Sequence, residues 1–227
     1  MSGSFPHYQL EETRAFRDNA LRNCTIRMRA ALLLAACATT LWAQGPTHPL
    51  RTYTAPDGAF AFRYSDQLLN CEQNPGQNCS AYHSVCDGSV GQDQTSMVCF
   101  AYPRNNYTNT QAFEAATFSI EVINHGARDK DCLAMPSEQA YLTRRGNRTI
   151  RGVLFVVYEF VEGGMNQRVD GVVYRTFHRG KCYQLGINVA TANAGVFDPP
   201  VREFTKNDRH EVNRRLEQAR DSFQFLK

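Results

Sequence analysis

The clearest hydrophobic pattern lies in residues 149–191, where three apolar runs are separated by two turn signals. In the first run, residues 154–161, apolar side chains occupy both alternating faces and only Glu159 interrupts them. This pattern is typical of a strand that is buried on both sides. Gly163 and Gly164 then favour a turn, because glycine accepts positive φ without steric cost.

A second apolar run, residues 171–178, leads into Arg179 and Gly180, which form a two-residue hairpin signal. The third run, residues 181–191, alternates strictly between two faces. One face carries Tyr183, Leu185, Ile187 and Val189, and the other carries Cys182, Gln184, Gly186 and Asn188. The sequence therefore predicts an antiparallel three-stranded meander as the centre of the fold.

Alternating apolar positions predict four further strands before this meander. They comprise residues 52–54, 59–64, 97–102 and 116–122, and the first two are joined by a Pro-Asp-Gly turn. Ser137 is expected to cap a short helix that reaches about Arg144.

The C-terminal segment predicts a helix that packs on the sheet. Asp208 is expected to cap this helix, with Glu211 three residues further on as in a capping box. Apolar residues follow at helical spacing, namely Val212, Leu216, Ala219 and Phe223. Residues 223–226 are expected to end the chain as a short strand.

The N-terminal residues indicate an export signal. Residues 1–27 are polar and are interpreted as an upstream, non-native extension, with Met28 as the true initiator. Residues 28–43 combine a basic start, an apolar core and small residues, which is typical of a signal peptide cleaved after Ala43.

Two alternatives remain open for this segment. Residues 34–37 match the lipobox of bacterial lipoproteins, so that Cys37 would carry a lipid anchor. The apolar run could also be a short buried helix. It is too short and too rich in alanine to predict a membrane span.

Residues 44–227 are expected to form a single disulfide-stabilised domain. Five of the 25 basic and three of the 22 acidic residues lie in residues 1–43, so the remainder is close to neutral. A nearly neutral chain without basic runs gives no electrostatic argument for binding nucleic acid or anionic membranes.

Six of the eight cysteines fall in the expected domain, and an even number after an export signal favours disulfides. The proposed pairing is Cys79 with Cys86, Cys71 with Cys99, and Cys132 with Cys182. These bonds would hold the polar loop of residues 70–95. No CxxC motif or zinc-like spacing is present, so no metal site is predicted.

The opening Tyr-x-x-x-Asp-Gly-x-Phe-x-Phe-x-Tyr, from Tyr53 to Tyr64, resembles the start of PsbP-like and Mog1-like domains. The mid-chain meander and the helix with a Phe-rich end, residues 216–226, are also similar to that family. The resemblance implies an α+β fold, an α/β/α sandwich around an antiparallel sheet. It also implies a protein that binds other macromolecules without a catalytic residue set. The six cysteines and the long 70–95 loop depart from the family pattern.

Candidate chemistry is sparse, and no catalytic or cofactor-binding residue set is predicted. A serine hydrolase would need G-x-S-x-G, but Asp87 stands at the first position of the nearest match, which contains Ser89. His83 is the nearest histidine to that match. His125, His178 and His210 also lack a partner pattern.

One candidate contact surface follows the strand at residues 97–102. It combines Tyr102, Arg104, Asn106 and Tyr107, a composition that interfaces favour.

These observations favour an exported, disulfide-stabilised, non-catalytic binding or assembly domain of the bacterial cell envelope. Its partner would be an envelope protein or ligand that the sequence does not identify. It would be secreted or periplasmic, with a lipoprotein as the alternative location. The alternative function is an envelope hydrolase or other enzyme whose dispersed site surrounds the cysteine-rich loop, with His83, Asp87 and Ser89 as its core.

Overall fold

The structure is a computed structural model that describes residues 48–71, 94–123, 128–134, 142–164 and 166–227. Its strands are β1 (Leu50–Thr54), β2 (Phe60–Ser65), β3 (Leu69–Asn70), β4 (Gln94–Pro103), β5 (Phe113–Ile123), β6 (Thr143–Ile150), β7 (Val153–Gly164), β8 (Gln167–His178), β9 (Lys181–Ala192) and β10 (Gln224–Phe225). Its helices are α2 (Asp129–Leu133) and α3 (Lys206–Ser222), with short 3₁₀ turns η2 (Arg104–Asn106) and η3 (Ala194–Val196).

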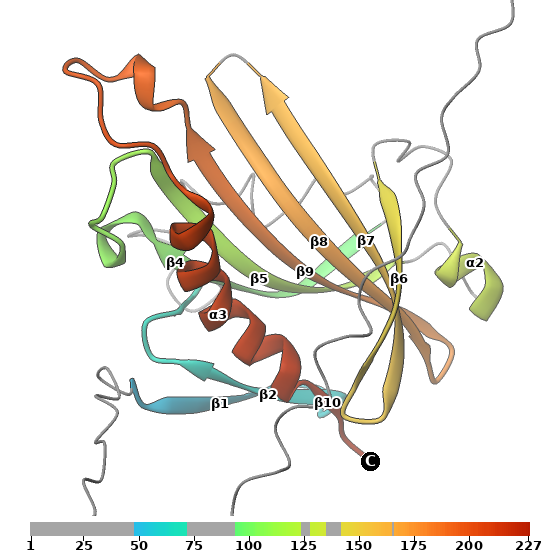
Figure 1. Cartoon of the computed structure of the whole chain (residues 1–227). Coiled ribbons are helices and arrows are strands. Elements are labelled where there is room, and N and C mark those ends of the chain that lie inside the picture. The colour runs from blue at the N-terminus through green and yellow to red at the C-terminus, as the bar shows by residue number, and fades with distance from the viewer. Residues whose placement is uncertain (1–47, 72–93, 124–127, 135–141, 165) are drawn as a thin grey trace, which may run out of the picture. The chain divides into compact units, whose positions relative to one another are not determined.

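Two antiparallel sheets make up the fold (Figure 1). The larger sheet has the order β3-β4-β5-β9-β8-β7-β6, and the smaller sheet has the order β1-β2-β10. Strands β7, β8 and β9 form the predicted meander and pair antiparallel with one another. Residues 46–227 form one compact unit.

The turn between β8 and β9 has the backbone that the sequence predicts. Arg179 and Gly180 have φ angles of 49° and 77°, and His178 pairs with Lys181 across the turn. Positive φ at both central residues gives the twist that matches the flanking strands. This turn fixes the register that separates the apolar and polar faces of β9.

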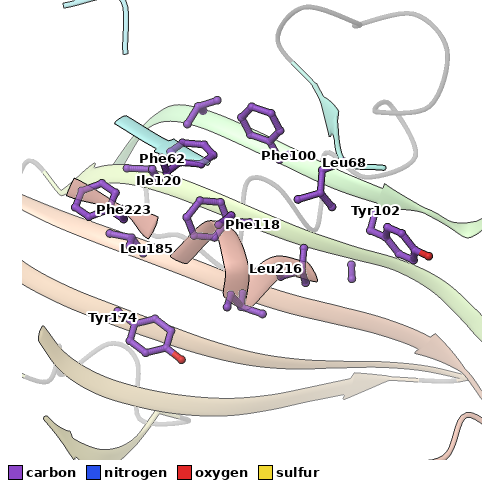
Figure 2. Packing of buried hydrophobic residues seen from close by; sticks show 14 of the residues in the cluster. Phe62, Leu68, Phe100, Tyr102, Phe118, Ile120, Tyr174, Leu185, Leu216 and Phe223 are labelled. Atoms are coloured by element: carbon purple, nitrogen blue, oxygen red, sulfur yellow. The ribbon is translucent and has the colours of Figure 1, made fainter. Parts of the chain in front are cut away.

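The larger sheet has two different faces, which we call the helix face and the rear face. The helix face lies under α3 and carries the predicted apolar residues of β9, such as Leu185 and Ile187. Figure 2 shows aromatic and aliphatic side chains of β2, β4, β5, β9 and α3 meeting there. Burial of this apolar surface is the main force holding α3 and the smaller sheet in place.

The rear face is covered in part by α2. Cys132 of α2 forms a disulfide with Cys182 of β9, as the predicted pairing has it. The hydroxyl of Tyr158 donates a hydrogen bond of 2.8 Å to the carbonyl oxygen of Leu133. Helices therefore lie on both faces of the sheet, and the α+β, α/β/α architecture predicted from the sequence is confirmed.

The C-terminal helix was predicted correctly, apart from its cap. The buried side of α3 contains Val212, Leu216 and Ala219, and β10 forms the predicted terminal strand. The N-cap is Thr205, whereas Asp208 is the third helical residue of the capping box. The Thr205 side chain accepts a hydrogen bond from the Asp208 backbone N–H, and the Asp208 carboxylate accepts one from the Thr205 N–H.

Two other predictions need correction. Residues 143–144 belong to β6 and not to the end of a helix, while residues 137–141 of that predicted helix lie outside the described residues. Strand β7 is only partly buried on both sides, because Leu154 and Val161 are 57% and 55% exposed. These positions lie toward the two ends of the strand.

None of the described helices has the length and apolar character needed to cross a lipid bilayer.

Candidate functional site

A pocket of about 460 Å³ lies on the helix face, beside α3. The helix packs on β2, β5 and β9, and Figure 1 shows β7 and β8 passing to one side of it. The pocket is lined by residues of α3 and of the four strands β6, β7, β8 and β9. Its volume falls within the range of about 300–1,000 Å³ that is usual for small-ligand sites.

The floor of this pocket is aliphatic. Val172 of β8 and Ile187 of β9 are paired across the sheet and both line the pocket, and Val189 lies two residues further along β9. The floor is the continuation of the apolar face of β9 beyond the area that α3 covers. A ligand with an aliphatic group would bury apolar surface here.

One wall of the pocket carries an ion-pair cluster centred on Asp170. Arg209 Nη2 of α3 lies 2.8 Å from Asp170 Oδ2, and Arg168 donates two hydrogen bonds of 2.8 and 2.9 Å to the same carboxylate. Burial by itself would raise the pKa of Asp170, but the hydrogen bonds from Arg168 and the positive charge of Arg209 outweigh burial and lower that pKa. Asp170 is therefore a charged anchor for α3.

The opposite wall carries a second ion pair. Arg145 Nε of β6 donates a hydrogen bond of 2.7 Å to Glu159 Oε2 of β7. The two side chains are 57% and 44% exposed, so this pair is screened by water and adds little to stability. Each charged side chain that lines the pocket thus has an oppositely charged partner.

Asn213 of α3 differs from these groups. It lies one helical turn after Arg209 and lines the pocket. Its side-chain oxygen Oδ1 is buried and accepts no hydrogen bond within the described part of the chain. A buried acceptor without a partner costs about 1–3 kcal/mol, so this oxygen favours a ligand that donates a hydrogen bond.

The contact surface predicted around Tyr102 and Tyr107 is wrong for these two tyrosines. Both tyrosines are buried, at 0% and 3% exposure, so neither forms part of a contact surface. The sequence pattern placed both tyrosines at the end of a strand but did not show that α3 packs against them. Arg215 in the middle of α3 lies over the ring of Tyr102, and Asp208 in its first turn binds Tyr107. Arg104 and Asn106 are exposed and bind neighbouring backbone carbonyls, of Gln111 and Gln67 respectively. A contact role for these two residues stays a prediction.

Tyr107 belongs instead to a network that anchors the start of α3. Its hydroxyl donates a hydrogen bond to Asp208, which also binds Arg202 through two hydrogen bonds of 2.8 Å. Burial and the bond to Asp208 raise the pKa of Tyr107 to about 12, while Arg202 lowers the pKa of Asp208. A tyrosine with this pKa keeps its proton at neutral pH and cannot act as a base there. We therefore assign the network a structural role.

The rear face carries a buried polar network that the sequence pattern did not indicate. Arg175 Nε donates to Gln184 Oε1 at 2.8 Å, and Gln184 Nε2 donates to Glu121 Oε2 at 3.1 Å. Ser119 donates to the other oxygen of Glu121 at 3.1 Å. Buried charged groups need partners, and these partners lie on three neighbouring strands. A shift in the pairing of β5, β8 or β9 would separate them, so the network favours the observed registers.

The remaining predicted site residues are only partly described. Cys71 and Cys99 are both disulfide-bonded. Cys79, Cys86, His83, Asp87, Ser89 and His125 lie outside the described residues. The pairings of Cys71 with Cys99 and of Cys79 with Cys86 stay predictions. His178 stacks on Phe225, and His210 is exposed on α3. The described residues contain no cluster of His, Cys, Asp and Glu side chains that could hold a metal ion.

Comparison with known proteins finds similar solved structures but no matching family. No protein-family model and no curated protein matches the chain. Among solved structures, cyanobacterial PsbP (CyanoP) from Synechocystis is similar, with a TM-score of 0.39 and 13% identity over 85% of this chain and 99% of that chain. The Ran-binding protein Mog1p of Saccharomyces cerevisiae gives a TM-score of 0.41 and 10% identity over 78% and 96% of the two chains.

A crystal structure from Bacteroides thetaiotaomicron is also similar, with a TM-score of 0.42 and 8% identity over 78% of this chain. This chain spans about half, 48%, of the length of that protein. The chain is thus similar in fold to a PsbP and to a Mog1 protein. At these identities the similarity concerns the fold alone.

Proposed function

We propose that this protein is an exported, disulfide-stabilised, non-catalytic binding domain of the bacterial cell envelope, and that its ligand site is the pocket beside α3. The observation that carries the proposal is the pocket itself. It joins an aliphatic floor at Val172 and Ile187 to walls whose charges are already paired, with one buried acceptor left at Asn213. Such a site can hold a ligand, but its charged groups are occupied with one another and are poor candidates for a nucleophile or base.

Two features support export. Residues 28–43 have the order of a signal peptide, with a basic start before an apolar core. The Cys132–Cys182 disulfide is of the kind that persists in oxidising compartments such as the bacterial periplasm.

Binding in the pocket is tested with three probes that share one ring and differ in charge. They are cyclohexanecarboxamide, cyclohexanecarboxylate and cyclohexylmethylammonium, titrated at millimolar concentration into the isotopically labelled domain. We expect at least one to produce saturable shifts of the methyl signals of Val172 and Ile187. Shifts confined to other parts of the protein, or no shifts with any probe, would remove the pocket from the proposal.

The alternative function is an envelope hydrolase with His83, Asp87 and Ser89 around the cysteine-rich loop. It predicts hydrolysis of a p-nitrophenyl ester at a rate that Ser89→Ala abolishes. Turnover that Ser89→Ala leaves unchanged, or no turnover at all, would count against this alternative.

A further inference from the structure

We infer that the ligand of this pocket is an extended, uncharged segment of polypeptide with an aliphatic side chain. The inference rests on the proposed binding function and adds the chemical class of the ligand. It follows from three properties of the described residues, which are the charge balance, the free acceptor and the aliphatic floor.

The charge balance disfavours ligands that carry full charges. Arg209 is bound to Asp170, and Arg145 is bound to Glu159, so the lining has two positive and two negative side chains in mutual contact. An anion would have to separate a carboxylate from its arginine, and a cation would have to separate an arginine from its carboxylate. A neutral ligand avoids the cost of leaving either charge without its partner.

Asn213 supplies a hydrogen-bonding group that matches a peptide bond. A carboxamide contains one acceptor and an NH₂ donor side by side, and a peptide unit offers an N–H and a C=O. The buried Oδ1 has no partner within the described residues, so an incoming N–H would satisfy it. The side chain lies on the flank of α3 that faces the pocket, next to the ion pair of Arg209.

The aliphatic floor adds a place for one side chain. Val172 and Ile187 face the same side of the sheet as the apolar core, and Val161, which is 55% exposed, also lines the pocket. An extended peptide that pairs one amide with Asn213 can direct a valine-like side chain onto this floor. A free amino acid would bring the same side chain with two full charges, which the paired walls disfavour.

The test uses N-acetyl-alanyl-valyl-alanine N-methylamide as the probe and free valine as its charged counterpart. Both are titrated into the disulfide-bonded domain while the methyl signals of Val172 and Ile187 are followed by NMR. We expect the capped peptide to bind with a Kd in the millimolar range or tighter and at least about 10-fold more tightly than valine, a difference of about 1.4 kcal/mol.

Asn213→Leu removes the carboxamide at similar size and is expected to weaken the capped peptide at least about 10-fold. Asn207→Leu, at an exposed position of the same helix, is the matched control and should leave the Kd unchanged. Should Asn213→Leu fail to fold, Asn213→Ala tests the same point, because it removes the acceptor Oδ1 without adding bulk and should also weaken binding.

The outcomes separate this inference from the proposed function. If valine binds as well as the capped peptide, or if Asn213→Leu and Asn213→Ala bind normally, the peptide inference is wrong while the pocket remains a binding site. If neither probe shifts the pocket signals although a cyclohexane probe does, the inference is also wrong and the binding function stands. If no probe of either set binds there, both are wrong.

Discussion

Arg220 Nη1 donates a hydrogen bond of 2.7 Å to the hydroxyl oxygen of Tyr174, and its guanidinium lies 5.1 Å from the centre of the Tyr174 ring. Arg220 is 1% exposed and joins the end of α3 to β8. The same guanidinium binds the carboxylate of Asp221, which Arg148 of β6 also contacts at 3.1 Å. This contact ties the C-terminal end of α3 to β8.

Tyr174→Phe is therefore expected to lower the free energy of unfolding by about 1 kcal/mol, because a buried charged donor loses one of its acceptors while the ring packing and the contacts of Arg220 with Glu217 and Asp221 are kept. Chemical denaturation measures the change. Tyr64→Phe is the matched control, since the Tyr64 hydroxyl forms no hydrogen bond within the described residues, and we expect it to cost much less. Equal losses in the two variants would contradict a specific role for the Arg220–Tyr174 contact.

The Cys132–Cys182 disulfide is expected to contribute about 4 kcal/mol to stability by closing a loop of 50 residues in the unfolded chain. We expect the double variant Cys132→Ser with Cys182→Ser to lose most of this amount in urea unfolding. Cys79→Ala should cost less, because the predicted pairing of Cys79 with Cys86 closes a far shorter loop. A larger loss for Cys79→Ala would contradict the predicted pairing.

Acid is expected to loosen the C-terminal strand. The His178 ring stacks on Phe225 at 3.8 Å, and burial first and the charge of Arg179 second lower the pKa of His178. A lowered pKa means that the folded state binds a proton less readily than the unfolded state does. Stability is therefore fully present above the unfolded pKa of about 6.5 and is lost as the pH falls through the lower folded pKa.

The measurement is the free energy of unfolding between pH 7 and pH 5. His178→Phe keeps an aromatic ring against Phe225 and should reduce the slope of stability against pH. His210→Phe, at an exposed position of α3, should keep the slope of the wild type. If both variants show the wild-type slope, protonation of His178 is not the cause.

Export has a consequence that a mass spectrum can test. Trp42 is the sole tryptophan, and cleavage after Ala43 would remove it. The exported protein should then match the mass of residues 44–227 and show tyrosine fluorescence only. A protein that begins at Cys37 with a lipid would support the lipoprotein alternative, and an intact mass beginning at Met1 from export-competent cells would contradict both.

Strands in which apolar and polar side chains alternate could be predicted from the sequence. In β9 the alternation from Cys182 to Val189 fixes which side chains face α3, and Arg179 with Gly180 fixes the turn before it. Strand β6 was missed because its sequence, Thr143–Ile150, is largely polar and exposed. An edge strand of this kind is held by backbone pairing with β7, which leaves no apolar period in the sequence.

The pocket could not be predicted because it depends on where α3 crosses the sheet. In the sequence, Asn213 is one polar position of an ordinary amphipathic helix. Only the contact of Arg209 with Asp170 shows that this side of α3 faces β8. Burial of Tyr107 has the same kind of cause, since its partner Asp208 is 101 positions away. Contacts over such separations leave no local pattern in the sequence.

The most direct test of the proposed binding site is to fill the pocket. Val172→Trp places a large ring on its floor, whereas Val196→Trp adds the same ring at a position that is 47% exposed in η3. The Kd of cyclohexanecarboxamide is measured by NMR titration for the wild type and for both variants, with melting temperatures as a check of folding. We predict that Val172→Trp weakens binding at least about 10-fold while Val196→Trp leaves it unchanged. Unchanged binding in a folded Val172→Trp variant would contradict the assignment of this pocket as the ligand site.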